Sequence, residues 1–559
     1  PPSPAPPPLN RRVCLFSARS NHLFHFAFSQ LPVEIGDVNC CWSAATLFKT
    51  LGTASLLTLF SSAGFVTAAQ AETYYVSSTK GDDSFTGTSP AQPWRSLSRV
   101  SSFPLQPGDN VVLTSGSVWR EPLTITRSGS EKAPIMVTSA GGAPRARIDA
   151  GGISPHGVGV INAEYVTISG LEVTNNAPSP AQRTGVLVSA EDRGLTRGIR
   201  ITDMYIHDVR GTNDRKDNGG IVFRAAGQRV PTRFHDLAIE RNIIWRVDRS
   251  GIAGISDQVT SLNWFPSEKV VIRDNYVEDV GGDGIVPRGT NGALIEHNIV
   301  RYAGSRAPGY NAGIWQWSTD NSLIQLNEAA YTRTRYDGQG FDSDFNSRRT
   351  TFLYNYSHDN AGGFLLICSP KQDEKGNIGN HGTTARFNVS RNDGTRIFQI
   401  AGNVSDALIE KNVIHVGKAM DVQMVVATQW DGWARKVRFK DNVFKVAGKA
   451  RYGSEIGRSG PDYLIKAGFD PAESIRFKGN SYFGSHVDAP DDGGGRIEAV
   501  YEEQPSDWQA PAFDPAKPEG FSDYLTRHRS WMIAMLRREL GAFVELKQPK
   551  RLRVSEARR

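Results

Sequence analysis

The chain of 559 residues is poor in cysteine and in charge, and each shortage excludes a class of protein. Its 4 cysteines are too few for a scaffold held together by disulfides. Only 22% of the residues are charged while 39% are hydrophobic, which excludes an intrinsically disordered chain. The net charge of +6 is small, and no zinc finger, helix-turn-helix or interleaved basic and aromatic patch occurs, so we expect no nucleic-acid partner.

Glycine, in contrast, is plentiful. The 55 glycines show no triplet period, which excludes collagen and favours a fold rich in turns and strands. None of them forms a nucleotide-binding loop, and the cysteines form no thiolate zinc motif. The glycines must therefore have a structural role in turns.

Residues 1–71 have the character of a leader. No methionine precedes Met136, so we expect an upstream region followed by a signal peptide. Lys49 precedes the apolar run Leu51–Val66, and Ala69-Gln70-Ala71 follows it, an order typical of secretory signals cleaved after Ala71. The alternative is a buried or membrane-spanning helix, but the run is short and contains several Ser, Thr and Gly residues. We expect a secreted or periplasmic protein without a stable membrane span.

Three of the four cysteines lie in this leader, at Cys14, Cys40 and Cys41. Cleavage would leave Cys368 as the only cysteine of the mature chain, so no intramolecular disulfide could form. We expect Cys368 to be buried among apolar side chains, which is the usual environment of a free cysteine.

A degenerate repeat organises much of the remaining chain. Each copy contains a short alternating strand, an asparagine, a second short strand and a glycine-rich turn, as in LAIERNIIWRVDRSGI from Leu237. Strands with a period of two exclude a helical solenoid, and stacked coils would bury one face of every strand. The repeat predicts an all-β parallel β-helix of about ten or more coils. The repeated asparagines, 23–38 residues apart, are Asn242, Asn275, Asn298, Asn327, Asn355, Asn388, Asn412, Asn442 and Asn480.

Asparagine at a repeated turn tolerates left-handed backbone and can form side-chain hydrogen bonds with the asparagine of the next coil. We predict the β-helix, with an N-terminal cap, over residues 72–485 and a tail over 486–559. Helical spacing in the tail predicts a helix that packs on the solenoid and caps its end. The residues with that spacing are Phe521, Leu525, Trp531, Met532 and Met535.

Four glycine–hydrophobic pairs align the strands on which chemistry is expected. The aligned segments are Gly284–Arg288, Gly313–Trp317, Gly340–Asp344 and Gly363–Ile367. If the hydrophobic residues Ile285, Ile314, Phe341 and Phe364 point inward, the next residues point outward. One outward column would then contain Val286, Trp315, Asp342 and Leu365, and a second Arg288, Trp317, Asp344 and Ile367. Two carboxylates, two indoles and a guanidinium would share one exposed face.

Such a face suits a sugar polymer, because indoles stack on pyranose rings and paired carboxylates can act as acid, base or nucleophile. Asp337, just before the strand, can supply another carboxylate. Two other interpretations of Asp337, Asp342 and Asp344 remain open. They can be calcium ligands, since oxygen donors suit that ion, or polar residues with a structural role. The two tryptophans can likewise pack beneath a loop.

His358 beside Asp359 has the form of a catalytic dyad. His358 lies three residues after the repeated asparagine of its copy. The same position recurs in other copies of the repeat, so it can have a purely structural role. It is occupied there by Trp245, Glu278, Arg301, Arg391 and His415. Further candidates are Asp283, Arg288, Asp320, Glu328, Arg396 and Trp430.

Two segments near the start, Tyr74–Val100 and Leu105–Ile125, resemble the entry of secreted right-handed parallel β-helix proteins of the pectate-lyase-like superfamily. This resemblance implies a polysaccharide-active protein. The segment DGQGFDSD from Asp337 resembles the acidic calcium segment of the family nine pectate lyases. In those enzymes a lysine on a following Gly-Phe-Lys strand removes a proton from the substrate. This chain has Leu365 at that position, and Lys371 is the nearest substitute.

We therefore expect a glycoside hydrolase that cleaves glycosidic bonds of a polysaccharide or oligosaccharide, acts as a monomer and requires no cofactor. Asp342 and Asp344 would be the catalytic pair with Asp337 in support, and Trp315, Trp317 and Arg288 would contact substrate. A calcium-dependent lyase acting on uronates, with Lys371 near the substrate, is the alternative. A non-catalytic β-helix that binds polysaccharide is a third possibility.

Overall fold

The computed structural model describes residues 71–179, 181–334, 336–370, 373, 376–452, 474–503, 508–541 and 543. These residues belong to one compact unit, Ala68–Arg559. The expected signal peptide lies outside the described residues, apart from Ala71 at its end. Among the described helices, none is both long and apolar enough to cross a membrane.

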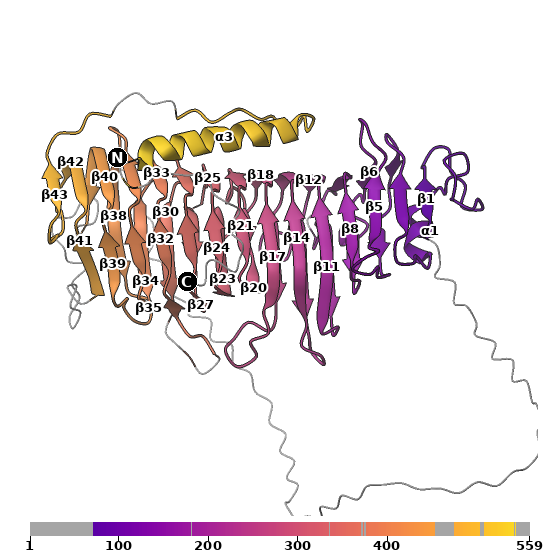
Figure 1. Cartoon of the computed structure of the whole chain (residues 1–559), viewed down its shortest axis with the longest axis horizontal. Coiled ribbons are helices and arrows are strands. Elements are labelled where there is room, and N and C mark those ends of the chain that lie inside the picture. Colours follow the sequence, from indigo (N-terminus) through magenta and orange to yellow (C-terminus); the bar gives the residue numbers. More distant parts are fainter. Residues whose placement is uncertain are drawn as a thin grey trace, which may run out of the picture. The chain divides into compact units, whose positions relative to one another are not determined.

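All ladders between the described strands are parallel, which confirms the predicted parallel β-helix, and they form three faces around one core. In Figure 1 the strands of successive coils lie side by side in chain order. Face 1 comprises β4 Leu123–Ile125, β7 His156–Ile161, β10 Thr184–Glu191, β13 Gly219–Ala226, β16 Ser250–Ser256, β19 Ile285–Val286, β23 Ile314–Asp320, β26 Gln339–Ser343, β30 Gly363–Ser369, β34 Arg396–Gly402 and β38 Asp421–Thr428.

Face 2 comprises β1 Thr73–Val76, β2 Asn110–Leu113, β5 Ile135–Ser139, β8 Val166–Ser169, β11 Leu195–Thr202, β14 Arg233–Glu240, β17 Ser267–Arg273, β20 Arg288–Asn291, β21 Leu294–Glu296, β24 Leu323–Gln325, β27 Ser347–Arg348, β28 Thr351–Leu353, β31 Asn380–His381, β32 Thr384–Arg386, β35 Val404–Ser405, β36 Leu408–Glu410, β39 Val437–Lys440 and β41 Ile475–Lys478.

Face 3 comprises β3 Val118–Trp119, β6 Arg147–Asp149, β9 Glu172–Asn175, β12 Tyr205–Val209, β15 Ile243–Val247, β18 Tyr276–Val280, β22 Ile299–Arg301, β25 Glu328–Ala330, β29 Tyr356–His358, β33 Val389–Arg391, β37 Val413–Val416, β40 Val443–Arg451, β42 Ser481–His486 and β43 Arg496–Glu498. The long strand β40 also pairs with β38 of face 1. Strand pairing extends to β43, inside the predicted tail.

The expected asparagine row is present over all nine predicted positions. Each asparagine is fully buried, and its Nδ2 donates to Oδ1 of the next one over 2.9–3.0 Å, from Asn242 as far as Asn480. The backbone N–H of the same residue donates to that same Oδ1, as Asn327 does to Asn355 at 3.0 Å. The row ends on a carboxylate, because Asn480 Nδ2 donates to Asp492 at 2.7 Å.

The left-handed backbone of this turn was predicted at the asparagine, and that detail is wrong. The residue before the asparagine has the positive φ instead. Because the asparagine itself continues into a strand, the reversal of chain direction must be completed one residue earlier. The left-handed residues are Arg241, Asp274, His297, Leu326, Tyr354, Phe387, Lys411, Asp441 and Gly479, with φ between 50° and 70°.

The predicted C-terminal helix is present as α3, Phe521–Leu540, but it does not cap the end of the solenoid. It lies along face 3, where Figure 1 shows it beside β18, β25 and β33. Tyr524 packs on Tyr276, and Met532 and Met535 belong to an apolar cluster with Tyr356 and Val389. Outward-facing aromatic and aliphatic residues of face 3 explain this position, because they pack against the apolar side of α3. The short helix α1, Leu97–Ser102, packs beside β4 near the first coils.

We predict that Asn327→Ala lowers the free energy of unfolding by about 2–4 kcal/mol, because it leaves buried donors of Asn298 and the carbonyl of Ile295 without partners. Urea denaturation followed by circular dichroism measures the change. Asn291→Ala is the control, since among the described residues the Asn291 side chain has only an exposed hydrogen bond, with Asn321, and we expect a loss below about 0.5 kcal/mol. Equal losses in the two variants would contradict a stabilising role for the row.

Candidate active site

The predicted outward column is present on face 1. Trp315 pairs with Asp342, and Ile314 pairs with Phe341, whose ring is fully buried in the core. In the second predicted column, Arg288 pairs with Trp317 through β20, which belongs to face 2. The next strand differs from the prediction by one residue, because Gly363 pairs with Gln339 and not with Gly340. Leu365 and Ile367, predicted to point outward, therefore lie in the core. Leu366 follows Asp342 in the column, and the thiol of Cys368 contacts Asp344.

Asp342 and Trp315 do not lie on an exposed face as predicted, whereas Asp337 and Asp344 are half-buried. Only 3% of Asp342 and 5% of Trp315 is accessible, because segments from other coils cover this part of face 1. What remains is a cleft with a volume of about 150 Å³. Its lining consists of Lys216, Tyr310, Asn311, Ala312, Trp315, Trp317, Asp337, Asp342, Asp344 and Phe345.

A buried polar cluster forms one wall of the cleft. Asp283 is fully buried and accepts hydrogen bonds from Lys216 Nζ at 2.8 Å and from Trp315 Nε1 at 2.9 Å. Arg249 lies 3.3 Å from the same carboxylate, and Lys216 Nζ lies 4.5 Å from the centre of the Trp315 ring. Trp315 is thus held in place by its N–H and covered by a cation, which makes it part of the wall.

Asp344 is the carboxylate with hydrogen-bond donors. The Cys368 thiol donates to it over 3.1 Å, and the backbone N–H of Phe345 donates over 2.7 Å. Burial raises the pKa of Asp344 to about 6, and these two hydrogen bonds oppose the rise because they favour the ionised form. Cys368 is buried as expected, but its thiol contacts this carboxylate in addition to the apolar Leu366 and Ala401.

Asp337 and Asp342 have weaker support, since the only donor near Asp342 among the described residues is the Cys368 thiol at 4.0 Å. Among the described residues, no hydrogen bond to the Asp337 carboxyl is formed, and burial together with the charge of Asp344 raises its pKa to about 7. Burial, Asp344 and Asp337 hold the pKa of Asp342 well above its usual range. Three carboxyls in one small volume cannot all be ionised, so the cluster retains protons near neutral pH.

The donor set of the cluster does not suit calcium. The group close enough to share an ion is Asp342, Asp344 and Cys368, whose ligand atoms lie within 4.8 Å of one another. Calcium takes six to eight oxygen ligands, whereas a thiol is a soft ligand, and Lys216 adds a positive charge beside the cluster. The same residues suit proton transfer, which requires carboxyls with unequal environments.

The other predicted residues are spread over different parts of the structure. Trp317 lines the cleft, but Arg288 stacks on its ring at 3.9 Å and is not part of the lining. His358 lies on face 3 in a separate hollow, and Lys371 lies outside the described residues. The sequence analysis missed Lys216, Tyr310, Asn311 and Phe345, which come from loops, and no periodic signal distinguishes them.

Comparisons with known proteins agree with this fold. A family model described as "Right handed beta helix region" matches residues 151–329 and 238–381. The chain is 28% identical to a lacto-N-biosidase of Bifidobacterium longum subsp. longum over 451 residues, covering 63% of this chain but only 28% of that protein.

Two crystal structures of GH136 lacto-N-biosidase from Eubacterium ramulus are also similar. The native protein is 29% identical with a TM-score of 0.55, covering 61% of this chain and 64% of that chain. The selenomethionine derivative is 27% identical with a TM-score of 0.54, covering 65% and 68%. The chain thus spans about a quarter of the curated relative and about two thirds of the crystallised one. These similarities confirm the expected fold, a right-handed parallel β-helix.

Proposed function

We propose that the protein is a glycoside hydrolase that cleaves a glycosidic bond of an oligosaccharide, with Asp337 and Asp344 as its catalytic carboxyls. The observation that carries the proposal is that these two carboxyls line one cleft in unequal environments. Glycosidases require one protonated and one ionised carboxyl beside the scissile bond. The similarity to lacto-N-biosidases supports this reaction class and makes lacto-N-biosidase activity the first one to test.

Asp337 and Asp344 have different roles in this proposal because their surroundings differ. Asp337, whose carboxyl accepts no hydrogen bond among the described residues and whose pKa is raised by burial to about 7, is the general acid that protonates the departing oxygen. Asp344, with a pKa of about 6 and two donors that stabilise its charge, is the carboxylate that acts as nucleophile or base. Asp342 is almost fully buried and stays protonated beside Asp344, where it limits the negative charge of the cluster.

Aromatic rings at the cleft provide surfaces for sugar rings. Tyr310 and Tyr336 are 67% and 53% exposed, and their ring centres lie 5.4 Å apart next to Asp337. Exposed aromatic faces are favourable contacts for the apolar side of a pyranose. Trp317 also lines the cleft, and the guanidinium of Arg288 lies over its ring. We propose that these rings, and not the buried Trp315, contact the substrate.

The remaining expectations rest on the sequence alone. The apolar run and small-residue motif ahead of Glu72 support export of the protein. We also propose that it acts as a monomer and without a cofactor.

Replacing either proposed catalytic carboxyl tests the assignment. We expect Asp337→Asn and Asp344→Asn each to lower the rate of sugar release by about a hundredfold or more, since each removes proton transfer or the attacking group. Release of reducing sugar from a panel of oligosaccharides measures the rate. Asp214→Asn, in an exposed loop residue, should leave the rate unchanged. Full activity in both catalytic variants, with an unchanged circular dichroism spectrum, would overturn the proposal.

The role of Asp342 can be tested through stability. A carboxyl whose pKa is raised by folding stabilises the protein fully below its unfolded pKa of about 3.9, and this contribution is lost as the pH rises through the folded pKa. Asp342→Asn removes one such group, so its Tm should exceed that of the original protein by more at pH 8 than at pH 5. Differential scanning calorimetry at both pH values measures this. The same pH dependence in Asp214→Asn would contradict the assignment.

Treatment with a chelator separates the hydrolase from the lyase alternative. We expect EDTA to leave the rate of sugar release unchanged, because the carboxyls act by proton transfer and covalent or general-base chemistry. The products should lack the ultraviolet absorbance of an unsaturated uronate. Loss of activity in EDTA that calcium restores, together with that absorbance, would favour the lyase.

A further inference from the structure

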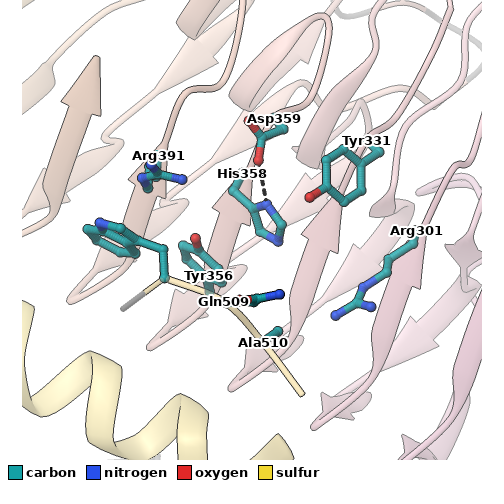
Figure 2. Close-up of a pocket in the computed structure, with 9 residues that line it drawn as sticks. Arg301, Tyr331, Tyr356, His358, Asp359, Arg391, Gln509 and Ala510 are labelled. Atoms are coloured by element: carbon teal, nitrogen blue, oxygen red, sulfur yellow. Dashed lines mark hydrogen bonds and ion pairs between the residues drawn. The ribbon is translucent and has the colours of Figure 1, made fainter. Parts of the chain in front are cut away.

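A second hollow lies on face 3, with a volume of about 440 Å³ (Figure 2). Strands β22, β29 and β33 form its floor, and the segment Trp508–Ala510 passes beside it. Its lining consists of Arg301, Tyr331, Tyr356, His358, Asp359, Arg391, Trp508, Gln509 and Ala510. This is the size of pocket that holds a small ligand.

The register of the coils explains why a hollow forms here. Arg301, Ala330, His358 and Arg391 occupy the same position on four successive strands. Ala330 is the one short side chain in this column, and it lies between the long side chains of Arg301 and His358, which both line the hollow. The position three residues after the repeated asparagine therefore has a structural role in most coils, and in these coils its side chains line a cavity.

His358 has a polar atom directed into the hollow without a hydrogen-bond partner among the described residues. Its Nδ1 is 2.8 Å from Asp359, and Figure 2 shows the other ring nitrogen pointing toward Gln509 and Ala510. Only 7% of the residue is exposed, and Nε2 makes no hydrogen bond, its nearest charged neighbour being Glu328 at 3.5 Å. A buried polar atom without a hydrogen-bond partner has lost its hydration and gained nothing in exchange. A bound ligand would supply the missing hydrogen bond.

The charge of the hollow indicates the chemistry of the ligand. Arg301 is already neutralised by the buried Glu328 at 2.6 Å, to which His528 of α3 also binds. Arg391 lies 3.5 Å from Glu503 and has a buried Nε without a hydrogen-bond partner among the described residues. Burial lowers the pKa of His358, but the hydrogen bond between Nδ1 and Asp359 and the negative charges of Asp359 and Glu328 raise it above its ordinary value overall. Nε2 is then a donor, and with Nε of Arg391 it is one of two cationic donors that form no hydrogen bond among the described residues, in a hollow that the carboxylate of Asp359 also lines.

The aromatic residues add an apolar boundary to these donors. Tyr356 stacks on His358 with ring centres 4.5 Å apart, and Arg391 lies over the Trp508 ring at 5.1 Å. A guanidinium and an imidazolium that converge on one space bind a carboxylate well, while the adjoining rings suit the carbon skeleton of a sugar.

We infer that this hollow is a second binding site, separate from the acidic cleft, for a ligand of the size of one sugar unit that carries a carboxylate, with Arg391 and His358 as its anion contacts. The inference does not depend on the proposed hydrolase activity. Because the acidic cleft repels a carboxylate, the two sites have opposite charge preferences.

Isothermal titration with a matched pair of sugars tests the site. D-glucuronate and D-glucose differ in the carboxylate alone, and the buffer should contain no carboxylate or phosphate. We expect glucuronate to bind at least about tenfold more tightly than glucose, because only the acid can form charge-assisted hydrogen bonds. Arg391→Gln and His358→Gln should each weaken glucuronate binding about tenfold or more, and Asp344→Asn should leave it unchanged.

Arg246→Gln is the control for the arginine. Arg246 also stacks on a tryptophan of face 3, Trp245, at 3.8 Å, but lies outside the hollow, so its replacement should not change binding. If His358→Gln does not fold, Arg391→Gln still decides the question, because Arg391 is partly exposed. Absence of glucuronate binding, equal binding of glucose, unchanged affinity in Arg391→Gln, or loss of binding in Asp344→Asn would overturn the inference.

Discussion

The hydrogen bonds between neighbouring coils determine where every side chain of this protein stands. Backbone ladders alone would allow one coil to slide along the next, since each step restores the same bonds. The buried asparagine row removes that freedom, because Nδ2 and the backbone N–H of one residue must both reach a single oxygen of the next. A slip of one residue would also turn core side chains outward. The meeting of Trp315 with Asp342, and of His358 with Arg391, follows from this constraint.

Two buried acidic groups show how partners decide the role of a carboxyl. Glu328 and Asp342 are both almost inaccessible to solvent. Burial disfavours the charge of Glu328, but Arg301 and His528 hold its pKa well below the usual range, so it binds α3 to face 3 as an ion. Asp342 has acidic neighbours and no ion pair within the described residues, and its pKa is raised. The ion pairs of Glu328 stabilise the fold, whereas Asp342 remains protonated beside the cleft.

The sequence was sufficient for features that depend on periodicity. The asparagine row, the inward direction of Ile314 and Phe341, and the apolar face of α3 follow from spacing and were predicted correctly. It was insufficient where a non-periodic residue decides. One additional residue before β30 moves Leu365 into the core, and the position of α3 depends on which face lacks a cover. Lys216 reaches the cleft from a loop more than a hundred residues before Asp337, a contact that exists only after the coils have stacked.

The carboxylate at the end of the asparagine row has a consequence for the terminal coil. Every amide in the row donates one N–H to the next residue toward the C-terminal end and the other to a carbonyl of the preceding coil, so the row leaves one donor, with its partial positive charge, at Asn480. Asp492 neutralises that charge and accepts a further hydrogen bond from Tyr482 at 2.8 Å. A carboxylate has no N–H group that could donate a hydrogen bond to a further residue. The row of hydrogen bonds therefore ends at Asp492. The last described coil presents no free amide with which a second molecule could continue the stack into a fibre.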